Sequence, residues 1–384
     1  MKNHRILVMK LSPYNGLNSS TMRMLALMSG LDLLGYSMDL LTIPLSVSSV
    51  EMNMDEYSFL ERVNIIFTKP NSVYQAAFSK KSILRALKPT LRKIYHRLFQ
   101  GDQTDAIAKT VKIDLLPNKE YDCIIAVSDP KSTYDALLNL LNQGLKADSI
   151  IEYWGDPLAI DMTNKSITPN FILRNRESKF LRIANRIVYT NPFTLEAQKQ
   201  LYPEFAERMI YTPTANLREK LYPNKKHASF VVGYYGAYTS TVRNIMPLYK
   251  AVVQLSDVKT YIVGDSDISL SSTENVEVRK RSNVQKLEED TDLFVCILNL
   301  SGTQIPGKIY HVAATNRPIL VIMDGERKED IKKYLEGFNR YIMCENEEKA
   351  IINAIDEVRK NKSTYQPLTA LKAENVAKKV IGLK

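Results

Sequence analysis

The sequence is poor in cysteine and histidine. It holds three cysteines, Cys123, Cys296 and Cys344, and four histidines among 384 residues. The cysteines are widely spaced and odd in number, and the first two lie in apolar segments, which is typical of buried thiols in a reducing compartment. The histidines form no metal-ligand spacing. We therefore expect neither a disulfide framework nor a metal site.

Long hydrophobic runs are also missing. No apolar run is long enough to span a bilayer. The apolar stretch within residues 5–11 is too short for a signal peptide and is typical of a first buried strand. Hydrophobic residues make up 45% of the chain and charged residues 24%, as in ordinary globular proteins. A chain of this length suits two hydrophobic cores, so we expect a cytoplasmic protein of two domains.

Acidic residues are outnumbered by basic ones. The chain has 52 Lys and Arg against 42 Asp and Glu, for a net charge of +10. Such an excess favours anionic partners, among them nucleic acid, anionic lipid and phosphorylated substrates. The excess is concentrated in residues 80–99, which hold seven Lys or Arg and no Asp or Glu.

The same segment has an apolar stripe. Leucine and isoleucine recur in it at spacings of three and four, at Leu84, Leu87, Leu91, Ile94 and Leu98. A basic amphipathic helix suits an anionic membrane surface, where each basic residue contributes about 1 kcal/mol. The alternative is an ordinary helix packed on its domain with its charges in water. The segment lacks interleaved aromatic residues, so we expect no nucleic-acid binding, and we expect peripheral attachment to the inner face of the cell membrane through residues 80–99.

Strand-like and helix-like segments alternate along the chain. The expected strands cover residues 5–11, 37–43, 122–127, 149–153, 186–190 and 209–212, and then 229–235, 259–263 and 275–279. The expected helices cover residues 19–34, 131–142, 243–255 and 346–360. This alternation predicts an α/β protein with two Rossmann-like parallel-sheet domains facing a cleft, with ligands bound beyond the carboxyl ends of the strands.

A polar stretch marks the domain boundary. Residues 222–227 combine proline with charged and polar residues, which suits neither a strand nor a helix interior. We therefore expect domains at residues 1–222 and 223–362. The remaining residues, 363–384, are expected to form a helix that can pack back on the first domain.

Residues 284–325 carry the strongest chemical signal. A buried strand within residues 293–300 is followed by a loop from Ser301 to Lys308, a short helix and a second buried strand. The loop brings backbone N–H groups, a helix N-terminus and a lysine to one point. That combination favours binding of a phosphate or diphosphate.

Two common nucleotide-binding motifs are incomplete here. Residues 302–308 fit G-x-x-x-x-G-K, but Ile309 follows where a P-loop has the Ser or Thr that holds magnesium. The loop after the first strand has the single glycine Gly16 and lacks the G-x-G-x-x-G of a nicotinamide dehydrogenase. Both classes of protein are therefore disfavoured.

The whole segment resembles the nucleotide-sugar half of GT-B glycosyltransferases, of the group 1 or family 4-like bacterial surface-polysaccharide type. The shared features are Thr291-Asp292 before the strand, Pro-Gly-Lys-Ile-Tyr-His at residues 306–311 and Asn-Arg-Pro at 316–318. The resemblance covers most of the chain and is specific mainly in its C-terminal half. The chain departs from the family at Thr303 and His311, where the family commonly has two glutamates, the second of which grips the nucleotide ribose.

The resemblance implies roles for several residues. Arg243, which follows the strand that ends at Gly236, takes the place of the basic residue that meets the donor diphosphate, and Lys308 would be its partner. Arg281 would lie near the base, while Gly302, Thr303, Gly307 and His311 would line the donor site. In the N-terminal half, the acceptor or the donor sugar would be positioned by Gly16, Asn18, Trp154 and Asp156. For Trp154 and Asp156 the alternative is a simple turn at Gly155-Asp156-Pro157.

The expected function follows from this resemblance. The N-terminal domain would hold the acceptor, and the C-terminal domain would hold the nucleotide-sugar. The protein would move a sugar from a nucleotide-diphosphate donor to a glycan or lipid-linked glycan, with the nucleotide-sugar as a substrate and without metal or cofactor. Two alternatives remain open: a non-catalytic GT-B-like subunit that binds a glycan or a partner, and a nucleotide-sugar epimerase or hydrolase of the same architecture.

Overall fold

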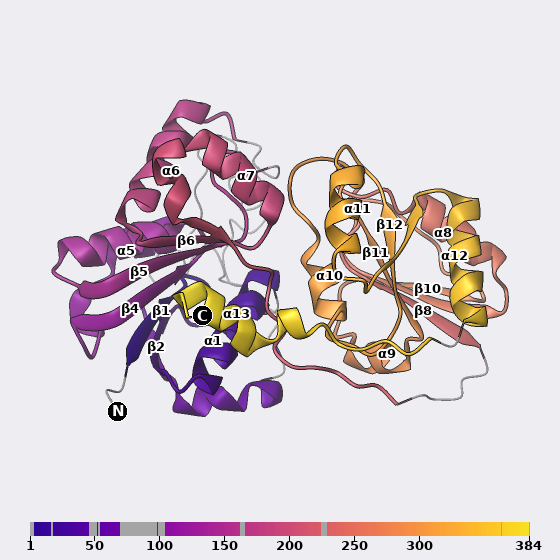
Figure 1. The fold of residues 1–384 in the computed structure, drawn as a ribbon, viewed down its shortest axis with the longest axis horizontal. Helices are drawn as coiled ribbons and strands as arrows, with labels where there is room; N and C mark the ends of the chain where they lie inside the picture. Colours follow the sequence, from indigo (N-terminus) through magenta and orange to yellow (C-terminus); the bar gives the residue numbers. More distant parts are fainter. Residues whose placement is uncertain are drawn as a thin grey trace, which may run out of the picture. The chain divides into compact units, whose positions relative to one another are not determined.

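The structure is a computed structural model that describes residues 4–16, 18–45, 52, 54–69, 98, 104–161, 166–223, 229–361 and 363–383. The basic segment 80–99 lies outside the described residues except for Leu98. The chain forms two compact units (Figure 1). The N-terminal unit comprises Met1–Leu217 with Ala373–Lys384, and the C-terminal unit comprises Arg218–Lys372.

The first boundary lies a few residues before the expected position at 222. The backbone N–H of Lys220 donates to the carbonyl of Ala314 (2.9 Å), and that of Tyr222 donates to the side chain of Asn316 (2.9 Å). Both acceptors belong to the C-terminal unit. These hydrogen bonds attach residues 220–222 to that unit, although their composition alone resembles a linker.

The N-terminal unit is built on a parallel sheet with the order β3-β2-β1-β4-β5-β6-β7 within the described residues. The strands are β1 Arg5–Met9, β2 Ser37–Thr42, β3 Asn64–Phe67, β4 Glu120–Val127, β5 Lys146–Trp154, β6 Arg186–Tyr189 and β7 Met209–Tyr211. Its helices are α1 Ser19–Leu33, α4 Asp105–Thr110, α5 Ser132–Asn142, α6 Asn170–Ile183, α7 Pro192–Leu201 and α13 Ala373–Ile381, with shorter 3₁₀ segments at Asp55–Arg62, Ile113–Leu115 and Pro203–Arg208.

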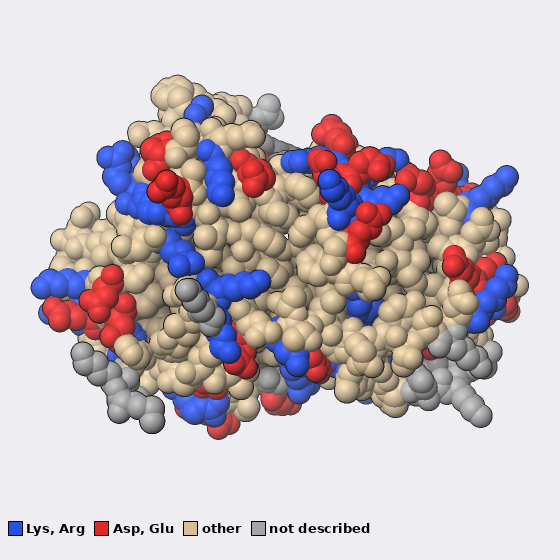
Figure 2. Space-filling model, viewed as in Figure 1, with Lys and Arg blue, Asp and Glu red and all other residues tan. Residues whose placement is uncertain are grey.

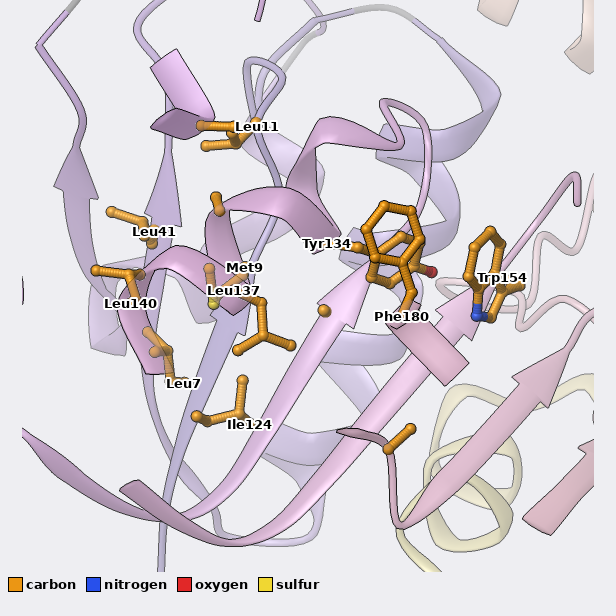
Figure 3. Close-up of a cluster of buried hydrophobic side chains, with 14 of the residues drawn as sticks. Leu7, Met9, Leu11, Leu41, Ile124, Tyr134, Leu137, Leu140, Trp154 and Phe180 are labelled. Atoms are coloured by element: carbon orange, nitrogen blue, oxygen red, sulfur yellow. The ribbon is translucent and has the colours of Figure 1, made fainter. Parts of the chain in front are cut away.

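Alternate residues of the strands face two different helix layers. In β1, Leu7 and Met9 join a core with residues of α4, α5, α6 and α7, whereas Ile6 and Val8 join a core with residues of α1 and α13. Side chains of successive strand residues point to opposite faces, so a strand buried on both faces is apolar throughout. Figure 3 shows the first of these cores, in which Leu7 and Met9 lie close to Leu137 of α5.

The C-terminal unit repeats the arrangement with a parallel sheet in the order β10-β9-β8-β11-β12-β13. The strands are β8 Phe230–Tyr235, β9 Val258–Val263, β10 Val276–Arg279, β11 Leu293–Ile297, β12 Ile319–Met323 and β13 Ile342–Glu345. The helices are α8 Met246–Gln254, α9 Gln285–Asp290, α10 Gly307–Val312, α11 Lys328–Glu336 and α12 Glu348–Lys360, with a 3₁₀ turn at Thr369–Leu371. Helices α8 and α12 cover one face, and α10 and α11 cover the other (Figure 1).

Both sheets reverse their strand order once. In the N-terminal unit the reversal lies between β1 and β4, and in the C-terminal unit it lies between β8 and β11. At such a point the crossover helices leave toward opposite faces, and the loops at the carboxyl ends of the two strands diverge. Ligands of open parallel sheets bind at these positions. The fold therefore directs attention to the residues that follow β1, β4, β8 and β11.

The C-terminal helix α13 packs against α1 through a close backbone approach. Val376, Ala377 and Val380 of α13 are buried in the core that α1 lines. At Gly30 of α1, an added Cβ atom would lie 2.1 Å from the carbonyl oxygen of Ala373. The contact between the two helices therefore requires glycine at position 30.

We expect Gly30→Ala to destabilise the N-terminal unit. Alanine favours a helix over glycine by about 0.5–1 kcal/mol, but overpacking of a closed contact costs about 1–3 kcal/mol. The net effect should be a lower free energy of unfolding, measured by urea denaturation. Ser29→Ala, on the same helix, is the matched control and should leave stability nearly unchanged. A Gly30→Ala protein as stable as the wild type would show that α13 does not require this contact.

Candidate functional site

A buried lysine lies at the switch point of the N-terminal sheet. Lys10 follows β1 directly and is fully buried. Its ammonium group donates to Ser20 Oγ and to the carbonyl oxygen of Asp129 (2.6 Å). Burial and the neighbouring charge of Arg23 lower the pKa of Lys10 to about 7. Strongly shifted groups of this kind are concentrated at functional sites.

Asp129 follows β4 and is enclosed by cations. Its carboxylate accepts a hydrogen bond from Arg23 (3.1 Å) and pairs with Lys131. Burial alone would raise the pKa of Asp129, but Lys131 and Arg23 hold it well below its ordinary value. The carboxylate is therefore ionised at neutral pH, and its charge is compensated within the cluster.

The end of β5 is tied to the same cluster. The N–H of Gly155 donates to Ser128 Oγ (2.8 Å). A Cβ atom at Gly155 would lie 2.3 Å from Nη1 of Arg23, so a larger residue there would displace the guanidinium from its present position. The carboxyl ends of β4 and β5 are thus held together by Ser128 and Arg23.

Asp156 is the other carboxylate at this edge. Burial and the charge of Asp129 raise its pKa to about 6, against the opposing charges of Lys131 and Arg23. Among the described residues, no group donates a hydrogen bond to its carboxyl group or pairs with it. Asp156 therefore lies in the charged cluster with its hydrogen-bonding capacity unused.

Glu177 of α6 fixes the segment that follows Asp156. Its buried carboxyl group accepts hydrogen bonds from the N–H groups of Leu158 (2.8 Å) and Ala159 (3.1 Å) and from the hydroxyl of Tyr202 (2.8 Å). Burial raises the pKa of Glu177. Because the backbone is held on both sides of Asp156, its position is set by the fold rather than by a mobile loop.

The structure corrects the prediction for Trp154. Its ring is fully buried, stacks on Tyr134 with centroids 4.2 Å apart, and donates its N–H to Glu152 (2.9 Å). It is the last residue of β5 and faces the helix layer of α5 and α6, as Figure 3 shows beside Phe180. No face of the ring remains for a sugar.

Gly16 and Asn18 have local structural roles. The side-chain oxygen of Asn18 accepts hydrogen bonds from the N–H of Thr21 (2.8 Å) and the hydroxyl of Ser20 (3.2 Å), which caps the N-terminus of α1. The buried Gly16 accepts from the N–H of Asn18 (2.9 Å). These contacts shape the turn before α1 and give Asn18 the role of a helix cap.

In the C-terminal unit, three loops meet at the switch point. The N–H of Leu300, after β11, donates to the carbonyl of Val242, after β8 (2.9 Å). The N–H of Glu326, after β12, donates to the carbonyl of Leu300 (3.1 Å). Gly302 adopts a φ of 82°, which suits glycine in this loop. The loop that contains Gly302 and Thr303 is thus fixed at the carboxyl edge, beside the segment that carries Arg243.

Arg243 lies in a turn and not in a helix, because α8 begins at Met246. The expectation that the helix begins at residue 243 is therefore wrong. Its Nη1 donates to the carbonyl of Ala237 (2.7 Å), while its buried Nε has no partner among the described residues. One N–H of the guanidinium is therefore left without an acceptor at the switch point.

Lys308 lies in the segment that follows β11, the strand next to β8. Burial raises the pKa of the Cys296 thiol to about 12, and the charges of Lys308 and Arg243 both act against this rise. Both charges therefore act on this thiol, and the hydrogen bond from Leu300 to Val242 joins the loop before Lys308 to the segment before Arg243. Helix α10, which begins at Gly307, has no side-chain cap, and no atom lies within 4 Å of the Cβ position of Gly307. Lys308 and the uncapped N-terminus of α10 therefore lie together in the segment that follows β11.

Glu288 was not found by sequence reasoning. This nearly buried residue of α9 pairs with Lys308 (2.8 Å) and Lys220 (3.6 Å). Burial alone would raise the pKa of Glu288, but Lys308, His311 and Lys220 lower it to about 2. Glu288 is one of several acidic residues before β11, and nothing in the local sequence distinguishes it from its neighbours. A phosphate that approaches Lys308 must share the ammonium group with this carboxylate.

His311 and Arg281 have different surroundings. The ring of His311 lies 3.9 Å from Glu288, and burial together with Lys308 lowers its pKa to about 3, so the imidazole is neutral at pH 7. Arg281 pairs with Asp265 (2.9 Å) on a half-exposed surface beyond β10. Strand β10 is the edge strand, two positions from β8, so the fold does not bring Arg281 to the switch point.

Gly236 begins the loop after β8, and its N–H donates to the carbonyl of Val263 (3.0 Å).

The surface charge is mixed on the face drawn in Figure 2, where Lys and Arg side chains are interspersed with Asp and Glu.

In the part of the chain that the structure describes, no helix is long and apolar enough to cross a membrane. Within the same residues, no group of three or more His, Cys, Asp or Glu side chains is arranged to hold a metal ion.

Comparison with known proteins identifies the fold. No family model and no curated protein matches the sequence. The structure matches Alr3699/HepE from Anabaena, solved with UDP and glucose, with 13% identity and a TM-score of 0.53 over 98% of this chain and 96% of that chain. It matches a glycosyltransferase from Rickettsia africae with 12% identity and a TM-score of 0.56 over 99% and 94%. A UDP-N-acetylglucosamine 2-epimerase matches with 10% identity and a TM-score of 0.51 over 99% and 95%.

These similarities extend over nearly the whole chain and confirm the predicted fold class. The protein has the GT-B architecture of two parallel-sheet α/β units. At this level of identity the comparison establishes the fold and not the reaction, because one fold hosts several activities.

We expect Glu177→Gln to destabilise the N-terminal unit. The amide keeps one acceptor oxygen, so at least one of the N–H groups of Leu158 and Ala159 loses its partner, at a cost of about 1–3 kcal/mol. Urea denaturation should show the loss, and limited proteolysis should show faster cleavage near residue 158. Glu196→Gln on α7 is the control. Wild-type stability in Glu177→Gln would mean that the carboxylate does not hold this loop.

The Glu288 ion pairs should make stability dependent on pH in the acid range. Because the folded-state pKa is lowered to about 2 from an ordinary 4.5, their contribution is fully present above about pH 5 and is lost as the pH falls toward 2. Glu288→Gln should lower the free energy of unfolding by about 1–3 kcal/mol at pH 7. This difference should shrink between pH 5 and pH 3.

Urea denaturation at several pH values measures the effect, with Glu289→Gln as the matched neighbour. A difference between Glu288→Gln and wild type that stays constant from pH 7 to pH 3 would contradict the assignment of these pairs.

Proposed function

We propose that the protein is a glycosyltransferase that moves a sugar from a nucleotide-diphosphate donor to a glycan or lipid-linked glycan. The observation that carries the proposal is that Arg243 and Lys308 follow the two neighbouring strands at the switch point of the C-terminal sheet, where the hydrogen bond from Leu300 to Val242 joins their loops. Parallel α/β sheets bind ligands at this position.

The chemistry of these groups suits a diphosphate. The planar guanidinium of Arg243 can bind two oxygens of a phosphate, and its unpartnered Nε is available as a donor. Lys308 adds a second positive charge, and the uncapped N–H groups of α10 add further donors. Fixed positive groups around the bridging oxygen stabilise the charge that develops when the bond between the sugar and the diphosphate breaks.

Glu288 has a supporting role in this proposal. It holds the ammonium group of Lys308 in the absence of donor, while Lys220 shares the same carboxylate. When a diphosphate binds, Lys308 can contact both anions, because an ammonium group has three N–H donors. The carboxylate then keeps the lysine oriented toward the donor rather than toward solvent.

UDP is the first nucleotide to test. HepE was solved with UDP and glucose, and the epimerase is named for a UDP-sugar. The loop of Thr303 and the neutral ring of His311 would then line the ribose side of the site, while Arg281, paired with Asp265 at the sheet edge, would reach the base only after leaving its partner.

The acceptor side of the proposal rests on the N-terminal unit. Asp156 offers an unpaired carboxyl group at the carboxyl edge of its sheet, which suits a sugar hydroxyl. Peripheral attachment to the cytoplasmic face of a membrane through residues 80–99 remains part of the proposal for a lipid-linked acceptor and rests on the sequence of that segment.

Assays of nucleotide-sugar turnover distinguish two other functions from sugar transfer. An epimerase of this fold would convert a nucleotide-sugar without any acceptor, and the similarity to a 2-epimerase favours testing it. A binding subunit would hold nucleotide or glycan without turnover. This alternative is favoured by Thr303 and His311, which stand where the family commonly has glutamates. Release of nucleoside diphosphate only in the presence of acceptor identifies the transferase.

Arg243→Ala should weaken nucleotide binding. Loss of a charge-assisted contact of about 1.5–3 kcal/mol raises Kd by roughly 10- to 100-fold. Thermal unfolding with UDP, GDP, dTDP, CMP, ATP and NAD first identifies the nucleotide, since saturating ligand stabilises the folded state by about 2.7 kcal/mol at a hundred times Kd. Calorimetry then compares the variant with the wild type.

Arg359→Ala is the control, because Arg359 pairs with Asp257 before β9, at the opposite edge of the sheet. Equal affinity of Arg243→Ala and wild type for the identified nucleotide would remove Arg243 from the donor site. Stabilisation by ATP or NAD alone would contradict the proposed donor class.

A further inference from the structure

An exposed apolar patch lies where α6 begins. Phe171 and Ile172, in the first turn of this helix, are 71% and 46% exposed, and Ile167, just before the helix, is 62% exposed. The hydroxyl of Thr168 donates to the carbonyl of Leu98 (3.1 Å), which brings a fourth exposed apolar residue to the same place. These four residues, called the α6 patch below, belong to neither core of the N-terminal unit. Exposed apolar groups that gather in this way mark interaction sites.

The rest of the outer face of α6 is basic. Its exposed residues include Arg174, Lys179 and Arg182, called the basic face below, and no Asp or Glu. Glu177 belongs to the same helix, but it is buried and bound to the backbone that follows β5. Phe171 lies three residues before Arg174, so the α6 patch and the basic face are neighbours on the helix surface. In Figure 1, α6 lies on the outside of its unit.

The N-terminus of α6 adds to the positive character. The helix begins at Asn170 after Pro169, with no side-chain cap among the described residues and no acidic residue in its first turn. A helix N-terminus carries a partial positive charge that favours anions such as a phosphate. Two acids near the helix, Asp105 and Asp135, pair with the half-buried Arg176 and therefore do not offset the exposed cations.

We propose that the beginning of α6 is a membrane-docking surface, at which the α6 patch inserts among the lipids and the basic face contacts anionic headgroups. The inference deepens the part of the proposed function that places the protein at a membrane, and it requires neither donor binding nor sugar transfer. The surface consists of described residues of the N-terminal unit alone.

The spacing of the two groups suits a lipid interface. Arg174, Lys179 and Arg182 lie roughly 5, 12 and 17 Å from Phe171 along the helix. Amphipathic surfaces bury their apolar side chains at the boundary between headgroups and acyl chains. The long stems of Lys and Arg then allow their charges to stay at the level of the headgroups, where each attracts anionic lipid.

Charge favours a lipid surface over a second copy of this chain. In a two-fold symmetric contact the same surface meets itself, so three exposed cations of one basic face would oppose three identical ones. An anionic bilayer has the complementary charge. The sequence of residues 80–99, with seven Lys or Arg and no Asp or Glu, runs to the α6 patch at Leu98. The same bilayer therefore suits both the basic face and this segment.

The first test reports the environment of residue 171 directly. Trp154 is the single tryptophan and is fully buried, so an added signal from Phe171→Trp belongs to the α6 patch. With vesicles of equal parts phosphatidylcholine and phosphatidylglycerol, we expect its emission to shift to the blue and to be quenched by brominated lipid. Leu33→Trp, at a side chain of α1 that is 66% exposed, is the matched control and should show neither effect.

An unchanged emission of Phe171→Trp in vesicle-bound protein would overturn the proposal, because attachment would then use another surface. Absence of any binding of the wild-type protein to these vesicles would overturn it as well.

The second test is co-sedimentation with the same vesicles. Phe171→Ser combined with Ile172→Ser removes apolar area that the lipid would bury, so the partition coefficient should fall at least about 10-fold. Leu33→Ser is the control and should bind as the wild type does.

The basic face is tested by Arg174→Gln combined with Lys179→Gln. Binding to the anionic vesicles should fall about 10- to 30-fold, with little change on phosphatidylcholine alone. Lys109→Gln combined with Lys112→Gln changes the net charge equally at exposed positions of the same unit and is the control. Equal losses in the two double variants would show that net charge alone governs binding, which contradicts docking through α6.

Two other occupants of the α6 patch are tested without lipid. Light scattering that shows a wild-type dimer, converted to a monomer by Phe171→Ser with Ile172→Ser, would assign the patch to a second copy and overturn the proposal. A large loss of thermal stability in this variant would show that the chain itself covers the patch, with the same consequence. None of these measurements uses nucleotide or acceptor, so their failure leaves the proposed sugar transfer intact, and failure of the nucleotide assays leaves membrane docking intact.

Discussion

The reversal of strand order beside β1 and beside β8 is the constraint on which both candidate sites depend. In a parallel sheet each strand ends at the same edge, and neighbouring crossovers normally fill the space above that edge. Where the order reverses, the loops diverge and leave room for charged side chains. Lys10 and Asp129 follow the two strands at one reversal, and Arg243 and the loop before Lys308 follow those at the other. The order of the apolar strands in each sheet therefore determines where charged side chains can gather at its carboxyl edge.

Much of the fold could be predicted, because a strand buried on both faces is an unbroken apolar run and a loop that turns after it contains glycine or proline. The same regularity misled the prediction for Trp154. It ends a strand at the correct edge, but the alternation of side chains turns its ring into the core that Tyr134 and Phe180 line. Asp156, two residues later and beyond the end of β5, points into the charged cluster instead. A difference of one or two residues at the end of a strand decides whether a side chain lies in the core or in the candidate site. Sequence patterns do not define the end of a strand to that precision.

The residues that sequence reasoning missed share a different property. Asp129 meets Arg23 from more than a hundred residues earlier, and Glu288 meets Lys220 from a segment before β8. Each is unremarkable in its local sequence, and its pKa depends on burial and on partners that include residues from distant segments. In contrast, Arg243 and Lys308 were predicted because their positions after glycine-containing loops are local features. The pairing of Lys308 with Glu288 could be seen only in the structure.

The two sites use charge in different ways, and the difference follows from burial. In the C-terminal unit, Lys308 and Lys220 share the single carboxylate of Glu288, so positive charge is in excess and favours an anion such as a diphosphate. In the N-terminal unit, Arg23 and Lys131 pair with Asp129, and burial together with the charge of Asp129 raises the pKa of Asp156 to about 6. The two sites thus differ in how completely their buried acids are paired: two lysines share Glu288, whereas Asp156 forms no ion pair with any described residue.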